Sequence, residues 1–410
     1  MPVTAGQILT AETLPSYLKK QWDELGLGSS LDCKMPAEGA LEGIAVSAIQ
    51  GGNVNYAFCV DLPALSRKVF VKQATEFIAI FGPDGFPLTS ERMQREMDVY
   101  TEWKEMLGEE ASKTYLPTIY GFDKKSMVVV MEFFDGYDLL DHVLVDEEGC
   151  SSLDQKAVGE ALGDFMGRVH AASYSSKLGE DPERIEYLKK HFENREMRDV
   201  QLEYVFTKCY KEATDEQRDG LTLTDEFLAE VDLLKKQYDG KVGDDALVLT
   251  HGDLHPGSVM VDATNASAKV IDPEFTVYGP AGLDVGSLLS GYCLGAIHQE
   301  YSGNPGAVEN IVVGAAAIWA SYSKALFDGG LTSEQIRAIE VETVGFTVAE
   351  VCRTALEFAG GRKWLQFEDP VTKKKANKAA LGLVQNCMTE RHEGGIALLF
   401  AEMRRKHINQ

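Results

Sequence analysis

The stretch LTHGDLHPGSVMVDATNASAKVIDPEF, residues 249–275, gathers metal-binding and proton-accepting side chains at the ends of short apolar runs. Its chemically active groups include His251, Asp253, His255, Asp272 and Glu274. Three interpretations fit these residue types. They are a zinc or iron site built from the first three residues, a phosphoryl-transfer site, or two surface hairpin turns without chemistry.

Two separated carboxylates favour the phosphoryl-transfer site. Asp253 follows a predicted buried strand at residues 246–250, and Asp272 ends another at residues 268–272. If these strands flank each other, as a hairpin predicts, both carboxylates emerge at one edge of the sheet. In magnesium-dependent phosphoryl transfer, one carboxylate orients and deprotonates the attacking hydroxyl, and another group holds the metal that bridges the phosphates. Oxygen ligands also suit Mg²⁺ better than zinc.

The zinc interpretation is weaker, because catalytic zinc usually draws its ligands from several chain segments with supporting partners. No second cluster of that kind is evident among the eight histidines. For His251 a structural role competes with a chemical one: its imidazole would hydrogen-bond the loop backbone and hold Asp253 in place.

Two upstream segments supply further parts of a phosphoryl-transfer site. Gly51 and Gly52 lie between two apparent strands, where backbone N–H groups can approach phosphate oxygens, although a diglycine hairpin turn is the commoner reason for such a pair. Lys72 places a charge within an apolar strand, and a buried lysine needs a partner. Glu96, on the following predicted helix, is the expected partner. Such a Lys–Glu pair steadies the α- and β-phosphates in kinase-type sites.

The elements that carry these residues change character along the chain. Residues 43–135 contain short β-branched and aromatic runs with one predicted helix at 87–108, which indicates a small antiparallel sheet. Beyond Phe134 the pattern is mainly helical, with a capping box from Ser152 to Gln155 opening one helix. We therefore predict an α+β fold with two lobes. Residues 1–133 form an N-terminal lobe, and residues 134–410 form a helical C-terminal lobe that carries the catalytic hairpin. This order suits a ligand held between two lobes.

Composition limits the partners. The 410 residues carry a net charge of −24, from 64 acidic and 40 basic side chains, which disfavours nucleic acid and anionic membranes as main partners. Seven scattered cysteines without a CxxC pair suggest reduced thiols in the cytoplasm. The N-terminus lacks the apolar core of a signal peptide, and no apolar run reaches the roughly 18 residues of a membrane span.

The strings LTHGDLHPGS and VIDPEFTVYGPAGLDVGSLL closely resemble methylthioribose kinases, within the aminoglycoside-phosphotransferase and choline-kinase group of protein-kinase-like folds. GGNVNYAF, VKQA and FPLTSERMQREMDVY also look like N-terminal segments of that family, so the similarity runs with gaps over most of residues 45–290. The HGD loop marks only the broad group. The string from Asp272 to Asp284 points to this branch.

The resemblance implies a role for each matching position, with ATP and Mg²⁺ as cofactors. Asp253 is expected to act as the catalytic base and, with His251, to contact the substrate. The other expected roles are magnesium ligands (Asp272, Glu274), binding of the ATP phosphates (Lys72, paired with Glu96), cover of the triphosphate (Gly51, Gly52, Asn53) and adenine contacts from the backbone near Glu132 to Phe134. Ser258 replaces the metal-binding asparagine of the broad group, as it does in methylthioribose kinases.

The likeness weakens after about residue 290. The family is expected to carry two consecutive arginines that help bind the sugar, in a context like GFAG followed by IRR. Here LEFAGGRKWLQFEDP places Arg362 and Lys363 about two positions early, and Arg353 is a further candidate. Arginine and lysine are not equivalent where a planar, bidentate donor is needed.

The resemblance implies a small-molecule kinase, expected to phosphorylate the 1-hydroxyl of 5-methylthioribose in methionine salvage, and a homodimer. One alternative is another acceptor, such as choline, an aminoglycoside, homoserine or another sugar. An acidic acceptor pocket would favour a cationic substrate, whereas Arg353, Arg362 and Lys363 would favour a polyhydroxylated one. The other alternative is a nucleotide-binding pseudokinase.

Overall fold

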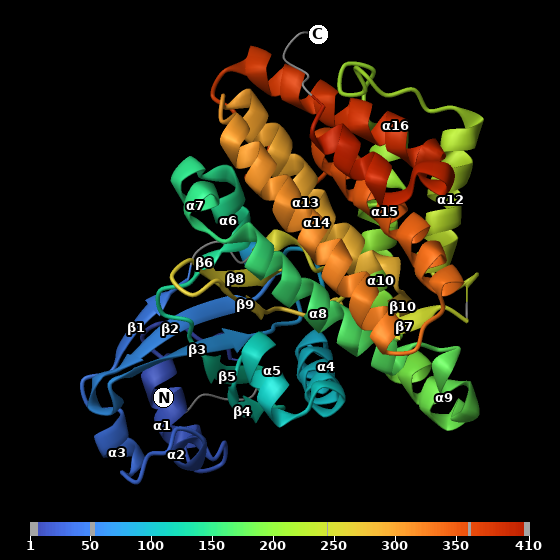
Figure 1. Ribbon diagram of the computed structural model, residues 1–410. Helices are drawn as coiled ribbons and strands as arrows, with labels where there is room; N and C mark the ends of the chain where they lie inside the picture. Colours follow the sequence, from blue (N-terminus) through green and yellow to red (C-terminus); the bar gives the residue numbers. More distant parts are fainter. Residues whose placement is uncertain (1–6, 50–53, 244, 360–361, 406–410) are drawn as a thin grey trace. The chain divides into compact units, whose positions relative to one another are not determined.

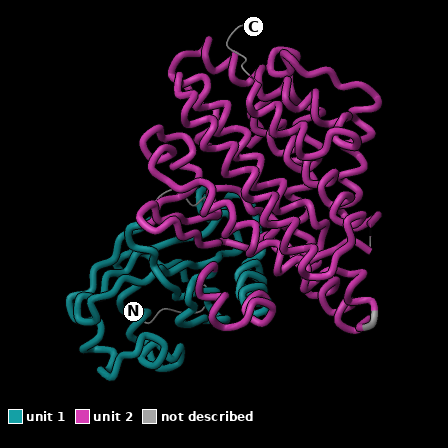
Figure 2. Tube along the Cα trace, in the orientation of Figure 1, with its two compact units in different colours: residues 1–102, 116–136 teal, residues 103–115, 137–410 magenta. Residues whose placement is uncertain are grey.

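The computed structural model describes residues 7–49, 54–243, 245–359 and 362–405. The chain forms two compact units (Figures 1 and 2). Unit 1 comprises Met1–Glu102 and Leu116–Gly136, and unit 2 comprises Trp103–Tyr115 and Tyr137–Gln410. The prediction divided the chain after residue 133. In the structure, residues 103–115 belong to unit 2 and residues 134–136 belong to unit 1. The division into two domains stays a prediction.

Unit 1 is built on an antiparallel sheet of five strands in the order β1-β2-β3-β5-β4. The strands are β1 (Ala45–Ala48), β2 (Tyr56–Leu62), β3 (Arg67–Gln73), β4 (Ile119–Asp123) and β5 (Val128–Glu132). Four of them match predicted runs, while β4 was missed. In β3 the residue Lys72 stands opposite Ala57 of β2 and Val129 of β5, so it lies on a central strand. The predicted small antiparallel sheet is confirmed.

Alternating apolar residues of this sheet pack against short N-terminal helices. The helices are α1 (Leu14–Gln21), α2 (Leu27–Ser30) and α3 (Ala37–Ala40), and α4 (Arg92–Leu107) supplies Glu96. Val60, Val71 and Val128 are almost fully enclosed in one cluster with Leu14 and Trp22. Burial of such side chains contributes roughly 1.5–3 kcal/mol each. This core stabilises the sheet that carries Lys72.

Unit 2 is mainly helical, as predicted. Its helices are α5 (Glu109–Tyr115), α6 (Leu140–Val145), α7 (Glu147–Ser152), α8 (Gln155–Ser173), α9 (Pro182–His191), α10 (Arg195–Tyr204), α11 (Lys208–Glu212), α12 (Asp225–Tyr238), α13 (Gly282–Tyr301), α14 (Pro305–Asp328), α15 (Ser333–Ala355) and α16 (Pro370–Met403). The capping box predicted at Ser152 is wrong, because Ser152 ends α7. Asp154 caps α8 instead, its carboxylate accepting from the N–H of Ala157. No described helix combines the length and apolarity that crossing a bilayer requires.

Two small sheets of unit 2 carry the HGD and DPE segments. One pairs β7 (Leu247–Leu249) with β10 (Tyr278–Pro280), and the other has the order β6-β8-β9, from β6 (Asp138–Leu139), β8 (Val259–Asp262) and β9 (Ser267–Val270). The expectation that the strands before Asp253 and Asp272 flank each other is therefore wrong. The strand before Asp253 pairs with β10, and the hairpin partner of β9 is β8.

Helix α8 packs along α14, and Figure 1 shows the two side by side. Gly159, Gly163 and Gly167 recur every fourth residue on α8, so they share the face that meets α14. A Cβ at Gly163 would lie 2.4 Å from the carbonyl oxygen of Ile318. The backbones therefore approach more closely than any larger residue allows.

We predict that Gly163→Ala forces α8 and α14 apart and lowers the free energy of unfolding by about 1–3 kcal/mol, the usual cost of overpacking. Urea denaturation followed by circular dichroism measures the change. Gly306→Ala in α14 is the matched control, because nothing lies within 4 Å of a Cβ there and alanine is the better helix former. Equal stabilities of the two variants would contradict the close approach.

Candidate active site

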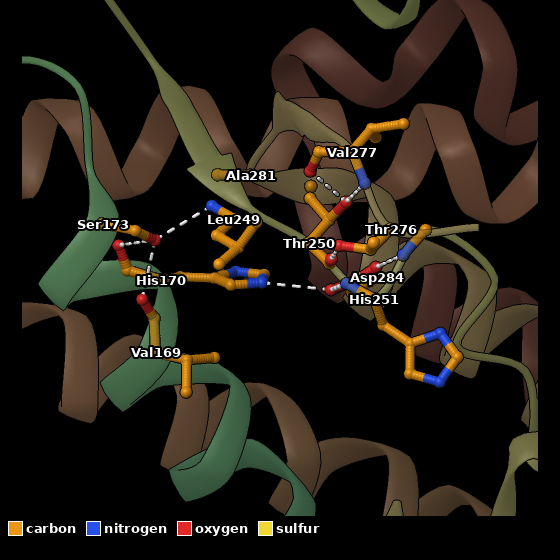
Figure 3. Close-up of polar contacts among 12 residues, drawn as sticks. Val169, His170, Ser173, Leu249, Thr250, His251, Thr276, Val277, Ala281 and Asp284 are labelled. Carbon is orange, nitrogen blue, oxygen red and sulfur yellow. Dashed lines mark hydrogen bonds and ion pairs between the residues drawn. The ribbon is translucent and has the colours of Figure 1, made fainter. Parts of the chain in front are cut away.

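The HGD loop is held by one buried carboxylate, that of Asp284 in the first turn of α13. Its Oδ2 accepts a hydrogen bond from the N–H of His251 at 2.7 Å (Figure 3), and its Oδ1 accepts from the N–H of Gly252 at 3.0 Å. Gly252 has φ +86, and a Cβ there would meet the carbonyl of Phe275 at 1.9 Å. Only glycine fits at this position, so packing explains why the HGD motif has glycine between its histidine and its aspartate.

Asp284 is in turn fixed by His170 at the end of α8. His170 Nε2 lies 3.1 Å from Asp284 Oδ2, and its Nδ1 lies 2.9 Å from the hydroxyl of Tyr322 on α14. Burial raises the pKa of Asp284, but the hydrogen bonds from His170 and from the His251 backbone outweigh it and hold that pKa below its ordinary value. Asp284 is therefore an anion that anchors the loop, a role that the sequence analysis did not assign.

His251 has a structural role. Its Nδ1 accepts from the N–H of Asp253 at 3.3 Å, so Nε2 carries the hydrogen and donates to the carbonyl of Ile271 at 2.8 Å. Both ring nitrogens are thus engaged by backbone atoms, which removes His251 as a zinc ligand in this conformation. The second bond ties the HGD loop to the residue before Asp272, although the strands themselves do not pair.

Asp253 stands in this fixed loop with its side chain about a quarter exposed. Its carbonyl accepts from the hydroxyl of Ser258 at 3.1 Å, and its Oδ2 lies 3.8 Å from His255 Nε2. His255 Nδ1 accepts from the N–H of Gly257. Burial and then the charge of Arg362 lower the pKa of His255 well below its ordinary value, so the imidazole next to Asp253 is neutral.

The DPE segment presents two carboxylates, one on each side of Pro273. Asp272 is exposed and has φ +64, a left-handed backbone conformation that is uncommon outside glycine. Glu274 is 2% exposed. A carboxylate oxygen of each lies within 4.8 Å of the other. Asn194 fixes the segment by donating its amide to the carbonyls of Glu274 and Thr276, both at 2.9 Å. Oxygen donors this close are the set that Mg²⁺ prefers.

The predicted Lys72–Glu96 pair forms within unit 1. Lys72 Nζ lies 2.6 Å from Glu96 Oε2, and the two residues are 5% and 1% exposed. Glu132 accepts two hydrogen bonds from Thr118, from its N–H and its hydroxyl, so its carboxylate is engaged within the sheet. Phe134 follows β5. Gly51, Gly52 and Asn53 lie outside the described residues.

The C-terminal basic residues separate into a pair and an outlier. Arg353 Nη2 lies 2.7 Å and Arg362 Nη2 lies 3.5 Å from the same oxygen of Glu350. Burial lowers the pKa of Arg353, but Glu350 and then Asp253 outweigh it and raise that pKa, which places this arginine in the field of the HGD loop. Lys363 is exposed and does not join the pair. Glu350 was missed because nothing in its own sequence context marks it.

Glu342 on α15 caps the helix that carries Asp284. Its Oε2 accepts from the N–H of Gly282, the first residue of α13, at 2.7 Å. Burial raises the pKa of Glu342 to about 7, against the opposing effects of that hydrogen bond and of Arg391. Glu342 is 8% exposed. The folded state therefore holds a proton on Glu342 more tightly than the unfolded state does.

We predict that Glu342→Gln, which keeps an acceptor but cannot ionise, changes the pH dependence of stability. The pKa of Glu342 is raised on folding, so its stabilising effect is complete below its ordinary pKa of 4.5 and is lost as pH rises through about 7. The free energy of unfolding of the wild type, relative to the variant, should fall by up to about 3 kcal/mol between pH 4.5 and 8. Urea denaturation at several pH values measures this. Glu334→Gln, at an exposed position of α15, is the control, and a flat difference for Glu342→Gln would refute the prediction.

One family model and several known enzymes resemble this chain. The chain matches the phosphotransferase enzyme family over residues 58–306. It is 26% identical over 348 residues to a methylthioribose kinase of Bacillus cereus (strain B4264), covering 82% of this chain and 84% of that enzyme. It is 29% identical over 256 residues to a methylthioribose kinase of Bacillus mycoides (strain KBAB4), covering 62% of this chain and 61% of that relative, less than two thirds of its length.

Among solved structures, a choline kinase from Cryptosporidium parvum Iowa II aligns with a TM-score of 0.49 and 15% identity, covering 97% of this chain and 100% of that one. The predicted resemblance to methylthioribose kinases is confirmed by the two curated relatives, and the predicted enzyme class by the family match. Because that match takes in more than half of the 410 residues, including the HGD loop and the DPE segment, the chain belongs to the phosphotransferase enzyme family.

Proposed function

We propose that the protein is an ATP-dependent kinase that transfers a phosphoryl group to the 1-hydroxyl of 5-methylthioribose. The observation that carries the proposal is the HGD loop, in which Asp253 stands on a backbone fixed by Asp284 and lies in the field of Arg353. In the proposed reaction Asp253 orients the acceptor hydroxyl and takes its proton. Support for the acceptor comes from curated relatives that are named methylthioribose kinases.

The cofactor roles follow from the donor groups. Asp272 and Glu274 offer close carboxylate oxygens that would hold Mg²⁺, which would neutralise charge on the phosphates. Lys72, kept in place by Glu96, would bind ATP phosphates, and Gly51, Gly52 and Asn53 would cover them. The backbone from Glu132 to Phe134 would receive adenine. The predicted cytoplasmic location and homodimer remain predictions.

The two guanidinium groups near Asp253 support a hydroxylated acceptor. Arg353 and Arg362 share the carboxylate of Glu350. Sugar hydroxyls can accept hydrogen bonds from guanidinium groups, whereas the quaternary ammonium of choline cannot. We therefore place Arg353 and Arg362 in substrate binding. Lys363, being exposed, is the weakest member of the predicted substrate set.

An acceptor panel tests the proposal. With MgATP and a coupled assay of ADP release, 5-methylthioribose should give the highest kcat/KM among 5-methylthioribose, D-ribose, choline, homoserine and kanamycin. Phosphorus NMR should place the phosphate on the 1-hydroxyl. Turnover of another acceptor with none of methylthioribose would overturn the substrate. Stabilisation by nucleotide in a thermal-shift assay without turnover of any acceptor would instead indicate a pseudokinase.

A second prediction concerns the proposed base. Asp253→Asn keeps the shape of the side chain but removes the proton acceptor, so kcat should fall by about 10²–10⁴-fold with ATP binding unchanged. The steady-state rate and the thermal shift with MgATP measure the two effects. Asp262→Asn is the control, because Asp262 lies on the neighbouring hairpin and only caps a turn at Thr264. Equal rates in the two variants would exclude Asp253 as the base.

A further inference from the structure

Helix α10 makes side-chain hydrogen bonds to the backbone of both segments that carry the proposed base and metal ligands. Asn194 stands at its N-terminal end, and Arg198 and Gln201 lie on it, three residues apart and therefore on one face. Gln201 donates to the HGD loop and Asn194 to the DPE segment. Arg198 Nη2 donates to the carbonyl of Tyr278 in β10 at 3.3 Å, which anchors the helix to the strand that follows the DPE segment.

Gln201 holds the peptide group that joins Gly252 to Asp253. Its Nε2 donates to the carbonyl oxygen of Gly252 at 2.8 Å, and the residue is 7% exposed. The N–H of the same peptide group belongs to Asp253 and donates to His251 Nδ1 at 3.3 Å. Because a peptide group is planar, holding both of its polar atoms fixes the direction in which the chain enters Asp253.

Asp284 and Gln201 restrain different parts of the HGD loop. Asp284 accepts from the N–H groups of His251 and Gly252, so it fixes the peptide groups that precede these two residues. The peptide group held by Gln201 is the next one along the chain, and the glycine before it gives it freedom to rotate. Without Gln201 a buried carbonyl would lose its donor, which favours rotation toward another one. Such a rotation would turn the side chain of Asp253.

Asn194 restrains the DPE segment in a similar way. Its amide nitrogen donates to the carbonyls of Glu274 and Thr276, both at 2.9 Å, so both amide hydrogens engage one short stretch of chain. Asn194 has φ 44, a left-handed conformation that asparagine adopts more readily than most residues. The carbonyl of Glu274 belongs to a proposed metal ligand, so rotation of this peptide group would move the carboxylate that it carries.

We propose that Gln201 and Asn194 are positioning residues of the kinase, which hold the base and the metal ligands to one common helix. Gln201 orients Asp253, and Asn194 orients the pair of carboxylates formed by Asp272 and Glu274. The inference rests on the proposed function, because it takes these three acids as the base and the magnesium ligands. It explains how two segments whose strands do not pair with each other keep a constant relation.

Gln201→Met tests the first positioning role, because methionine has a similar length and lacks the amide donor. The kcat for 5-methylthioribose should fall about 10- to 100-fold, while the KM for ATP stays within about twofold. Gln299→Met is the matched control. Gln299 is also buried in unit 2, and its Nε2 donates to a backbone carbonyl, that of Leu144 in α6, at 3.0 Å. Loss of stability alone would affect both variants alike, so equal kcat values would overturn the role of Gln201.

Asn194→Gly tests the second role, because glycine removes the amide and still adopts the left-handed conformation. The Mg²⁺ concentration that half-saturates the ADP-bound protein, followed by thermal shift, should rise about 10- to 100-fold, as is usual when a group that orients metal ligands is lost. Asn265→Gly is the control, since Asn265 bonds Ser267 in the turn between β8 and β9. An unchanged Mg²⁺ requirement in Asn194→Gly would overturn the role of Asn194.

Hydrogen exchange separates this inference from the proposed function, because it needs no acceptor. Mass spectrometry of a peptide that covers the HGD loop should show exchange at least about tenfold faster in Gln201→Met than in the wild type or in Gln299→Met. If exchange is unchanged in Gln201→Met, the inference fails even when the wild type is active. If the wild type phosphorylates no acceptor, the proposed function fails, while the exchange rates still decide whether Gln201 restrains the loop.

Discussion

The active-site geometry depends on a single buried anion, the carboxylate of Asp284, which accepts two backbone N–H groups of the HGD loop. A buried charge is tolerated only when it is fully paired, and here His170 and the loop itself provide the partners. If the loop shifted, the buried carboxylate of Asp284 would lose these hydrogen bonds. Asp284, which lies 31 positions further along the chain, therefore fixes the position of Asp253.

The charged groups around Asp253 have both signs. Arg353 and Arg362 share one carboxylate, that of Glu350, and the neighbouring His255 is neutral because burial and Arg362 both disfavour its protonation. In the proposed reaction the two guanidinium groups would suit the developing negative charge of a hydroxyl that loses its proton.

Sequence patterns predicted the features that depend mainly on residues close together in the chain. The five-stranded sheet was anticipated except for β4, and the Lys72–Glu96 pair followed from the rule that a lysine in an apolar strand needs a partner. The pairing of β7 with β10 was not predicted, because nothing in a three-residue strand specifies a partner about 30 residues away. Glu350 was missed because its contact with Arg362 joins α15 to a segment that the sequence pattern does not place beside it. The helix cap at Asp154 was predicted two residues too early, at Ser152.

The glycine face of α8 has a consequence for the chemistry at a distance. His170 sits on the same helix, less than one turn beyond Gly167, so the depth at which α8 beds into α14 also sets where the imidazole meets Asp284. The three glycines thus allow the backbones of α8 and α14 to lie in direct contact. A methyl group at any of them would push α8 away from α14 and disturb the contact between His170 and Asp284, and misplacements of about 1 Å at an active site can cost 10²-fold in rate. The absence of side chains at these glycines therefore helps to set the position of His170 and, through Asp284, of the HGD loop.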